Sequence, residues 1–200
     1  MARRILYSDG ARDPATHYAG CAYVYFDTLQ DAWVGSSRVL GRVESSQEAE
    51  ENAIIDALEV ARSSGSSHIT DFAVRSDALW LVEEINDHRL GRRPSRSHAI
   101  QEIIGLIHKL QALSKSVSVE WVAAHQGIEG NEVADAAAKE AKLRSFRAFK
   151  GLDSLTEPVR MESVSPEERK RYEVPGEIIF SKEAERLLLN AASDRDLPRS

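Results

Sequence analysis

Four acidic residues stand where elements of secondary structure are expected to begin or end. Asp9 closes a short apolar segment, and Asp77 closes another. Asp135 lies in the expected first turn of one helix, and Glu50 lies in the first turns of a different helix, beside its apolar face. Because strand ends of one sheet lie close together, we expect these carboxylates to converge although they are far apart in the sequence.

Convergence of these acids would be unfavourable without a counter-charge. Two carboxylates ~4 Å apart repel by about 4 kcal/mol at an effective dielectric near 20, and metal-free acids respond with raised pKa values. A pair of hard divalent cations, which prefer oxygen ligands, removes the conflict. Two such ions ~3.5–4 Å apart suit an in-line phosphoryl displacement, in which one activates water and the other stabilises the leaving oxygen.

The elements that would position these acids follow from hydrophobic periodicity. Short apolar or alternating segments predict strands, and apolar residues repeated at three and four positions predict helices. Ser45 with Glu48 fits a capping box at the start of the first helix, which Gly65 is expected to stop. Asn131 is a plausible cap of the last helix. The expected strands are 4–8, 19–26, 32–40, 69–75 and 117–122, and the clearest expected helix is 97–114.

The order of these elements is β-β-β-α-β-α-α-β-α, which predicts an α/β fold with one five-stranded mixed sheet flanked by helices. We expect this domain to cover residues 1–147. The sequence that follows is mostly polar and includes Pro158, Pro166 and Pro175, so residues 148–200 are interpreted as a C-terminal extension. A short helix is predicted near 181–192, and the role of the extension does not follow from its sequence.

Composition sets broad limits. The chain is 42% hydrophobic and 29% charged, which is ample for a buried core. No apolar run approaches the ~18 residues needed to span a bilayer, and a lone Cys21 excludes an internal disulfide framework. We therefore expect an intracellular protein, cytoplasmic or nuclear, without a membrane partner. The net charge of −6 does not exclude nucleic acid, because bound cations would offset several acids.

Four sequence blocks carry a specific resemblance. Residues 7–10 (Tyr-Ser-Asp-Gly), 49–54 (Ala-Glu-Glu-Asn-Ala-Ile), 75–77 (Arg-Ser-Asp) and 121–135, which begins Trp-Val-Ala-Ala-His-Gln-Gly, resemble the four blocks of type 1 ribonuclease H. They occur in the family's order across roughly residues 4–145. The last block is most similar to the ribonuclease H domains attached to reverse transcriptases of retrotransposons.

This resemblance implies a ribonuclease H-like fold and a set of roles. The family's metal-binding tetrad falls on Asp9, Glu50, Asp77 and Asp135, and His125 matches a histidine on a mobile loop that assists proton transfer or product release. The implied activity is an endonuclease that hydrolyses the RNA strand of an RNA–DNA hybrid and leaves 3′-hydroxyl and 5′-phosphate ends. The implied cofactor is Mg²⁺, as two ions, with Mn²⁺ as a substitute.

Five further residues are candidate nucleic-acid contacts. Ser46 and Gln47 occupy positions where cellular members often place asparagines that read the RNA strand, and both side chains can bond a 2′-hydroxyl. Arg92 and Arg93 lie in a basic loop that fits either phosphate binding or an ordinary solvated surface. Asn131 completes the set. Many relatives have an extra basic helix in this region, which is absent or reduced here, so we expect weaker hybrid binding by the isolated domain.

Other interpretations stay open on the sequence alone. Asp9 before Gly10 also fits a simple turn, Asp77 a helix cap, and Asp135 a favourable charge near a helix N-terminus. The main alternative function is a non-cleaving, retroelement-derived domain that binds nucleic acid or protein. A related nuclease acting on DNA is a second alternative, and a reverse transcriptase is a candidate protein partner. The oligomeric state does not follow from the sequence.

Overall fold

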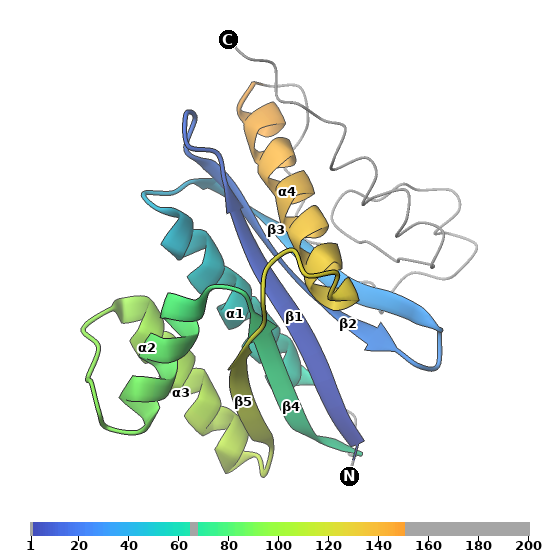
Figure 1. The fold of residues 1–200 in the computed structure, drawn as a ribbon, viewed down its shortest axis with the longest axis vertical. Coiled ribbons are helices and arrows are strands. Elements are labelled where there is room, and N and C mark those ends of the chain that lie inside the picture. The colour runs from blue at the N-terminus through green and yellow to red at the C-terminus, as the bar shows by residue number, and fades with distance from the viewer. Residues whose placement is uncertain (1, 65–67, 151–200) are drawn as a thin grey trace.

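The computed structural model describes residues 2–64 and 68–150. These residues form one sheet of five strands with helices packed on it (Figure 1). The elements are β1 (Ala2–Arg12), β2 (Tyr18–Asp27), β3 (Ala32–Arg42), α1 (Ser46–Ser63), β4 (Ile69–Ser76), α2 (Leu79–Arg89), α3 (His98–Ala112), β5 (Ser116–Trp121) and α4 (Glu129–Phe149).

The sheet is mixed, with strand order β3-β2-β1-β4-β5. β1 pairs antiparallel with β2, and β2 pairs antiparallel with β3. β1 pairs parallel with β4, and β4 pairs parallel with β5. The predicted α/β class, element order and five-stranded mixed sheet are therefore confirmed.

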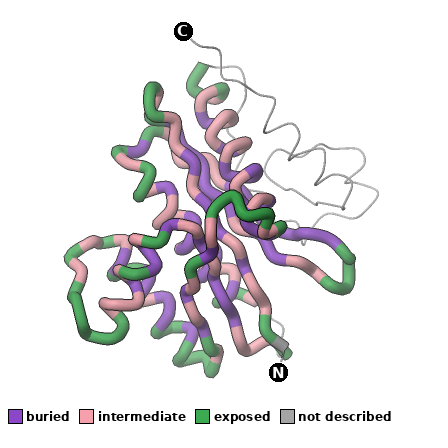
Figure 2. The backbone as a smooth tube through the Cα atoms, in the orientation of Figure 1, coloured by how far each residue is buried: buried purple, intermediate pink, exposed green. Residues whose placement is uncertain are grey.

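Helices cover both faces of this sheet because neighbouring strand residues point to opposite sides. Leu6 of β1 joins the large core formed with α1, α2 and α3, whereas the next residue, Tyr7, packs with Trp33 and Val133 beneath α4. Figure 2 shows the buried backbone along the sheet and on the inner sides of the helices, with exposure concentrated at the turns. None of the described helices combines the length and apolarity that crossing a membrane requires.

Most predicted helices are confirmed. Ser45 caps α1, where its Oγ accepts a hydrogen bond from the Glu48 amide at 3.2 Å. The carboxylate of Glu48 accepts from the amide of Glu44 rather than from Ser45, so only half of the capping box forms. The apolar faces of the helix predicted at 97–114 and of the helix predicted after Asn131 are buried in α3 and α4. The predicted stop at Gly65 and the predicted helix near 181–192 lie outside the described residues.

Two local predictions are wrong. β1 does not end at Asp9 but continues to Arg12, with Asp9 paired with Ala22 inside the sheet, because Gly10 serves close helix packing rather than a turn. α4 begins at Glu129 with Ile128 as its N-cap, because the Asn131 side chain bonds elsewhere. Asp135 consequently lies in the second turn of α4, not in the first. α4 ends at Phe149.

Candidate active site

Three of the predicted acids meet at one place. Asp9 lies within β1, Glu50 lies in the second turn of α1, and Asp77 directly follows β4. Each carboxylate offers an oxygen, and these oxygens lie within 4.8 Å of one another. Asp9 is buried, with 6% of its surface exposed, while Glu50 and Asp77 are half-buried. We call these three residues the acid triad.

Gly10 permits the approach of Glu50 to Asp9. A Cβ atom added to Gly10 would lie less than 3.0 Å from backbone atoms of Ala49 and Glu50, so the backbone of α1 rests directly on β1. The Gly10 amide also donates to Glu50 Oε2 at 3.1 Å. A side chain at position 10 would force α1 away from β1, and Glu50 would move with it.

Asp77 is held from two other elements. The indole Nε1 of Trp121, at the end of β5, donates to the main-chain oxygen of Asp77 at 3.2 Å. The amide Nδ2 of Asn131, in α4, donates to Asp77 Oδ2 at 3.1 Å. Asn131 is 2% exposed and its Oδ1 has no partner among the described residues. The sequence did not predict either contact.

The fourth predicted acid belongs to an adjoining group. Asp135 lies with Glu132 and His125, and one ligand atom from each lies within 4.8 Å of the others. His125 is exposed in the loop before α4 and has a positive φ of 53°. Lys139, one turn after Asp135, donates to Asp135 Oδ2 at 2.7 Å. Glu132 was missed as a site residue, although its spacing of three residues from Asp135 places both on one helix face.

The charges of the two groups act on one another. Burial, reinforced by the charges of Glu50, Asp135 and Asp77, raises the pKa of Asp9 well above its ordinary value, and only the charge of Lys139 acts to lower it. Burial and the charge of Asp77 raise the pKa of Glu50 to about 8, against the hydrogen bond from Gly10. The mutual repulsion predicted from the sequence is therefore present.

The donor set fits hard divalent cations. Asp9, Glu50 and Asp77 form no ion pair with any residue in the described part of the chain. Carboxylate oxygens in this number and proximity are the ligands that Mg²⁺ and Mn²⁺ prefer. A bound cation would also remove the repulsion that raises the pKa values of Asp9 and Glu50.

The remaining candidate contacts lie around this site or away from it. Ser46 and Gln47 are exposed in the first turn of α1, ahead of Glu50 on the same helix. Arg92 and Arg93 are exposed in the loop between α2 and α3, and Arg92 lies 3.8 Å from Asp87. The structure thus leaves these four side chains accessible to a ligand, whereas it buries Asn131.

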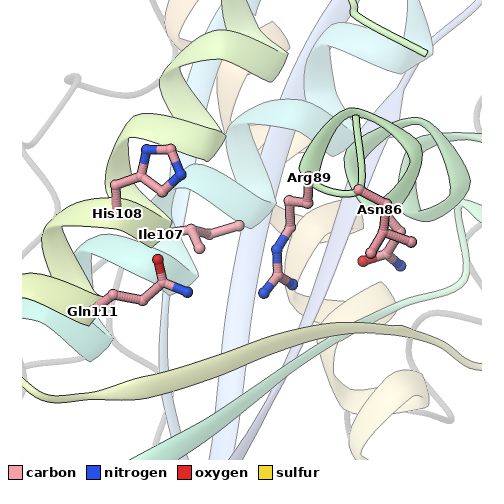
Figure 3. Close-up of a pocket in the computed structure, with 6 residues that line it drawn as sticks. Asn86, Arg89, Ile107, His108 and Gln111 are labelled. Carbon is pink, nitrogen blue, oxygen red and sulfur yellow. The ribbon is translucent and has the colours of Figure 1, made fainter. Parts of the chain in front are cut away.

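A pocket of about 430 Å³ between α2 and α3 lies apart from the acids. Two of its side chains hold the edge of the sheet, because Asn86 donates to the carbonyl of Val119 and Arg89 to that of Val117 in β5. None of the lining residues belongs to either acidic group. Figure 3 shows this pocket, which is lined by Asn86, Arg89, Leu90, Ile107, His108 and Gln111.

A mixed sheet in the order β3-β2-β1-β4-β5, with carboxylates from β1, from α1 and from the residue after β4 converging on one point, defines a ribonuclease H-like fold with a candidate metal site. The family model for RNase H matches residues 1–142. The chain belongs to the RNase H family and is a ribonuclease H by enzyme class.

Solved structures agree on the fold. The N-terminal RNase H domain of Rv2228c from Mycobacterium tuberculosis, solved as a fusion with maltose-binding protein, aligns with a TM-score of 0.58 and 21% identity over 74% of this chain and 99% of that one. RNase H1 from the halophilic archaeon Halobacterium salinarum aligns with a TM-score of 0.54 and 24% identity, over 70% and 97%. LC11-RNase H1, solved in complex with an RNA/DNA hybrid, aligns with a TM-score of 0.54 and 20% identity, over 72% and 99%. No curated protein matches the sequence.

Proposed function

We propose that this ribonuclease H is an endonuclease that cuts the RNA strand of RNA–DNA hybrids by two-metal-ion catalysis and leaves 3′-hydroxyl and 5′-phosphate ends. The observation that carries the proposal is the acid triad, whose three carboxylate oxygens lie within 4.8 Å and which has no ion pair among the described residues. The family match and the hybrid bound to LC11-RNase H1 support the choice of substrate.

Different residues of the chain would bind the metal ions and transfer protons. Asp9, Glu50 and Asp77 would hold one ion, and Asp135 would hold the second from the adjoining group. When bound, Mg²⁺ or Mn²⁺ ions activate the attacking water and stabilise the leaving oxygen. His125 is exposed beside Asp135, which suits a group that moves a proton or assists product release.

Four exposed side chains would contact the substrate. Ser46 and Gln47 stand ahead of Glu50 on α1, where their polar groups can bond a ribose 2′-hydroxyl and so distinguish RNA from DNA. Arg92 and Arg93 would bind phosphates at the end of α2. A reverse transcriptase partner and a retrotransposon origin remain predictions from the sequence.

The test uses the full chain with an end-labelled RNA–DNA hybrid in Mg²⁺, Mn²⁺ or EDTA. We expect metal-dependent cutting of the RNA strand, with a 5′-phosphate on the downstream product, and no comparable cutting of duplex DNA or duplex RNA. Asp9→Asn should abolish cutting. Asp71→Asn is the matched control, because this acid lies near the start of β4, is half-buried and pairs with Arg3. Retained cutting by the Asp9 variant, or none by folded wild-type protein, would contradict the proposal and favour the non-cleaving alternative.

A further inference from the structure

Asn131 is the most deeply buried amide side chain beside the acids, and its two ends differ. Its Nδ2 donates to Asp77 Oδ2 at 3.1 Å, whereas its Oδ1 has no partner in the described part of the chain. Buried polar atoms are nearly always hydrogen-bonded, so an unpaired acceptor at 2% exposure needs a reason.

The position of Asn131 on α4 links the two acidic groups. Asp135 follows it by four residues, and Glu132 is its neighbour, so one stretch of helix carries both acids of the second group. The same stretch reaches Asp77 of the acid triad through the amide of Asn131. A displacement of α4 would therefore move Asp135 and release Asp77 together.

The two ends of the amide suit two different tasks. A carboxylate has two oxygens, and a fixed donor on Oδ2 restricts rotation of the Asp77 carboxylate and leaves the other oxygen for a ligand. The unpaired Oδ1 of Asn131 requires a donor. Mg²⁺ keeps several of its waters when it binds protein carboxylates, and these waters are donors.

We propose that Asn131 is a positioning residue for the cation site: its Nδ2 orients Asp77, and its Oδ1 accepts a hydrogen bond from the hydration shell of the bound ion. This inference rests on the proposed function, because it assumes a divalent cation at the acid triad. It assigns Asn131 a role toward the ion, whereas the sequence suggested a contact with nucleic acid.

The test measures Mn²⁺ binding to the full chain by titration calorimetry, without nucleic acid. Asn131→Leu has a similar volume and neither a donor nor an acceptor, and Asn131→Ala is the second variant in case the first does not fold. Outer groups that orient metal ligands typically contribute about 10–100-fold to metal affinity, so both variants should bind Mn²⁺ at least about 10-fold more weakly. Asn86→Leu is the matched control, since its amide donates to a carbonyl in β5.

A second readout separates positioning from a structural role. Thermal unfolding in EDTA should change no more in Asn131→Leu than in Asn86→Leu, because without the ion each variant loses one hydrogen bond, that of Asn131 to Asp77 or that of Asn86 to Val119. Unaltered Mn²⁺ affinity in both Asn131 variants would overturn the inference while the metal site stands. Failure of the wild type to bind Mn²⁺, or equal binding by Asp77→Asn, would overturn the metal site itself, and the inference with it.

Discussion

Two charged clusters lie along the same pair of parallel strands, and they are built in opposite ways. Arg3, near the start of β1, and Arg75, near the end of β4, both pair with Glu120 of β5. Asp9, farther along β1, and Asp77, directly after β4, have no cation from the described residues as a direct partner. Asp71 also pairs with Arg3, so the first cluster contains two acids and two bases, whereas the acid triad contains acids alone.

The proton affinities follow this difference. Partial burial acts to raise the pKa of Glu120. Hydrogen bonds from Ser118 and Arg75, together with the charge of Arg3, outweigh burial and hold this pKa below its ordinary value. Burial and neighbouring acids instead raise the pKa values of Asp9 and Glu50. Paired acids of this kind add a little stability at the surface, whereas acids gathered without a cation repel one another and destabilise the metal-free fold.

The largest expected effect tests which cluster serves catalysis. Glu50→Gln should lower hybrid cleavage by at least about a thousandfold, because loss of a metal ligand removes several kcal/mol of transition-state stabilisation. Glu120→Gln should leave the rate within about twofold, since its side chain is tied to Arg3 and Arg75. Initial rates on one labelled hybrid at saturating Mg²⁺ measure both. Equal losses in the two variants would abolish the distinction.

The next effect is on stability against pH. Because folding raises the pKa of Glu50 from 4.5 to about 8, the folded state binds more protons in this interval, and metal-free protein should lose stability as the pH rises through it. A tenfold change in proton affinity is worth about 1.4 kcal/mol, and a total of roughly 1–3 kcal/mol is expected for coupled groups.

Urea unfolding in EDTA at several pH values measures this slope. Glu50→Gln should flatten it, and so should saturating Mg²⁺ in the wild type. Glu120 contributes with the opposite sign, since its pKa is lowered and its stabilisation is lost only as the pH falls. A wild-type slope equal to that of Glu50→Gln between pH 5 and 8 would show that the acids do not repel as described.

The smallest expected effect concerns the contacts that hold the charged residues of each cluster in place. In the Arg3–Glu120 cluster, long side chains bring the charges together. In the acid triad, the backbone contact at Gly10 sets the distance between α1 and β1. Gly10→Ala should destabilise the protein by about 1–3 kcal/mol through overpacking against α1. Gly105→Ala is the control, because its added Cβ meets nothing within 4 Å and a helical alanine is stabilising by about 0.5–1 kcal/mol. Denaturant midpoints of the two variants measure these changes in stability. A Gly10→Ala variant as stable as the wild type would contradict the close contact.

Much of the fold was predictable because its signals are local. The Ser45 cap, the apolar face of α1 and the isoleucines of α3 depend on neighbouring residues alone. Gly10 misled the prediction because a glycine after an aspartate is typical of a turn, while here it admits a helix backbone that lies some forty residues away in the sequence. Gly130 also permits close packing, since a Cβ there would meet the rings of Tyr7 and Trp33.

The site was predictable in its acids but not in their supports. Spacing and family resemblance led to Asp9, Glu50 and Asp77, which the structure brings together. The bonds from Trp121 and Asn131 to Asp77 depend on how β5 and α4 pack against the end of β4, which no local pattern records. Residues that carry charge are thus easier to find in a sequence than the neutral residues that hold them.

The hydrogen bond from Gly10 to Glu50 has a spectroscopic consequence. This amide sits inside β1 and donates to a carboxylate of the acid triad at 3.1 Å, so its proton senses the charge on that group directly. Glycine amides often resonate in a sparse region of a ¹⁵N spectrum, and a single labelled Gly10 would report protonation of Glu50 and arrival of a cation as separate shifts. One backbone nitrogen would then follow the site without any substrate present.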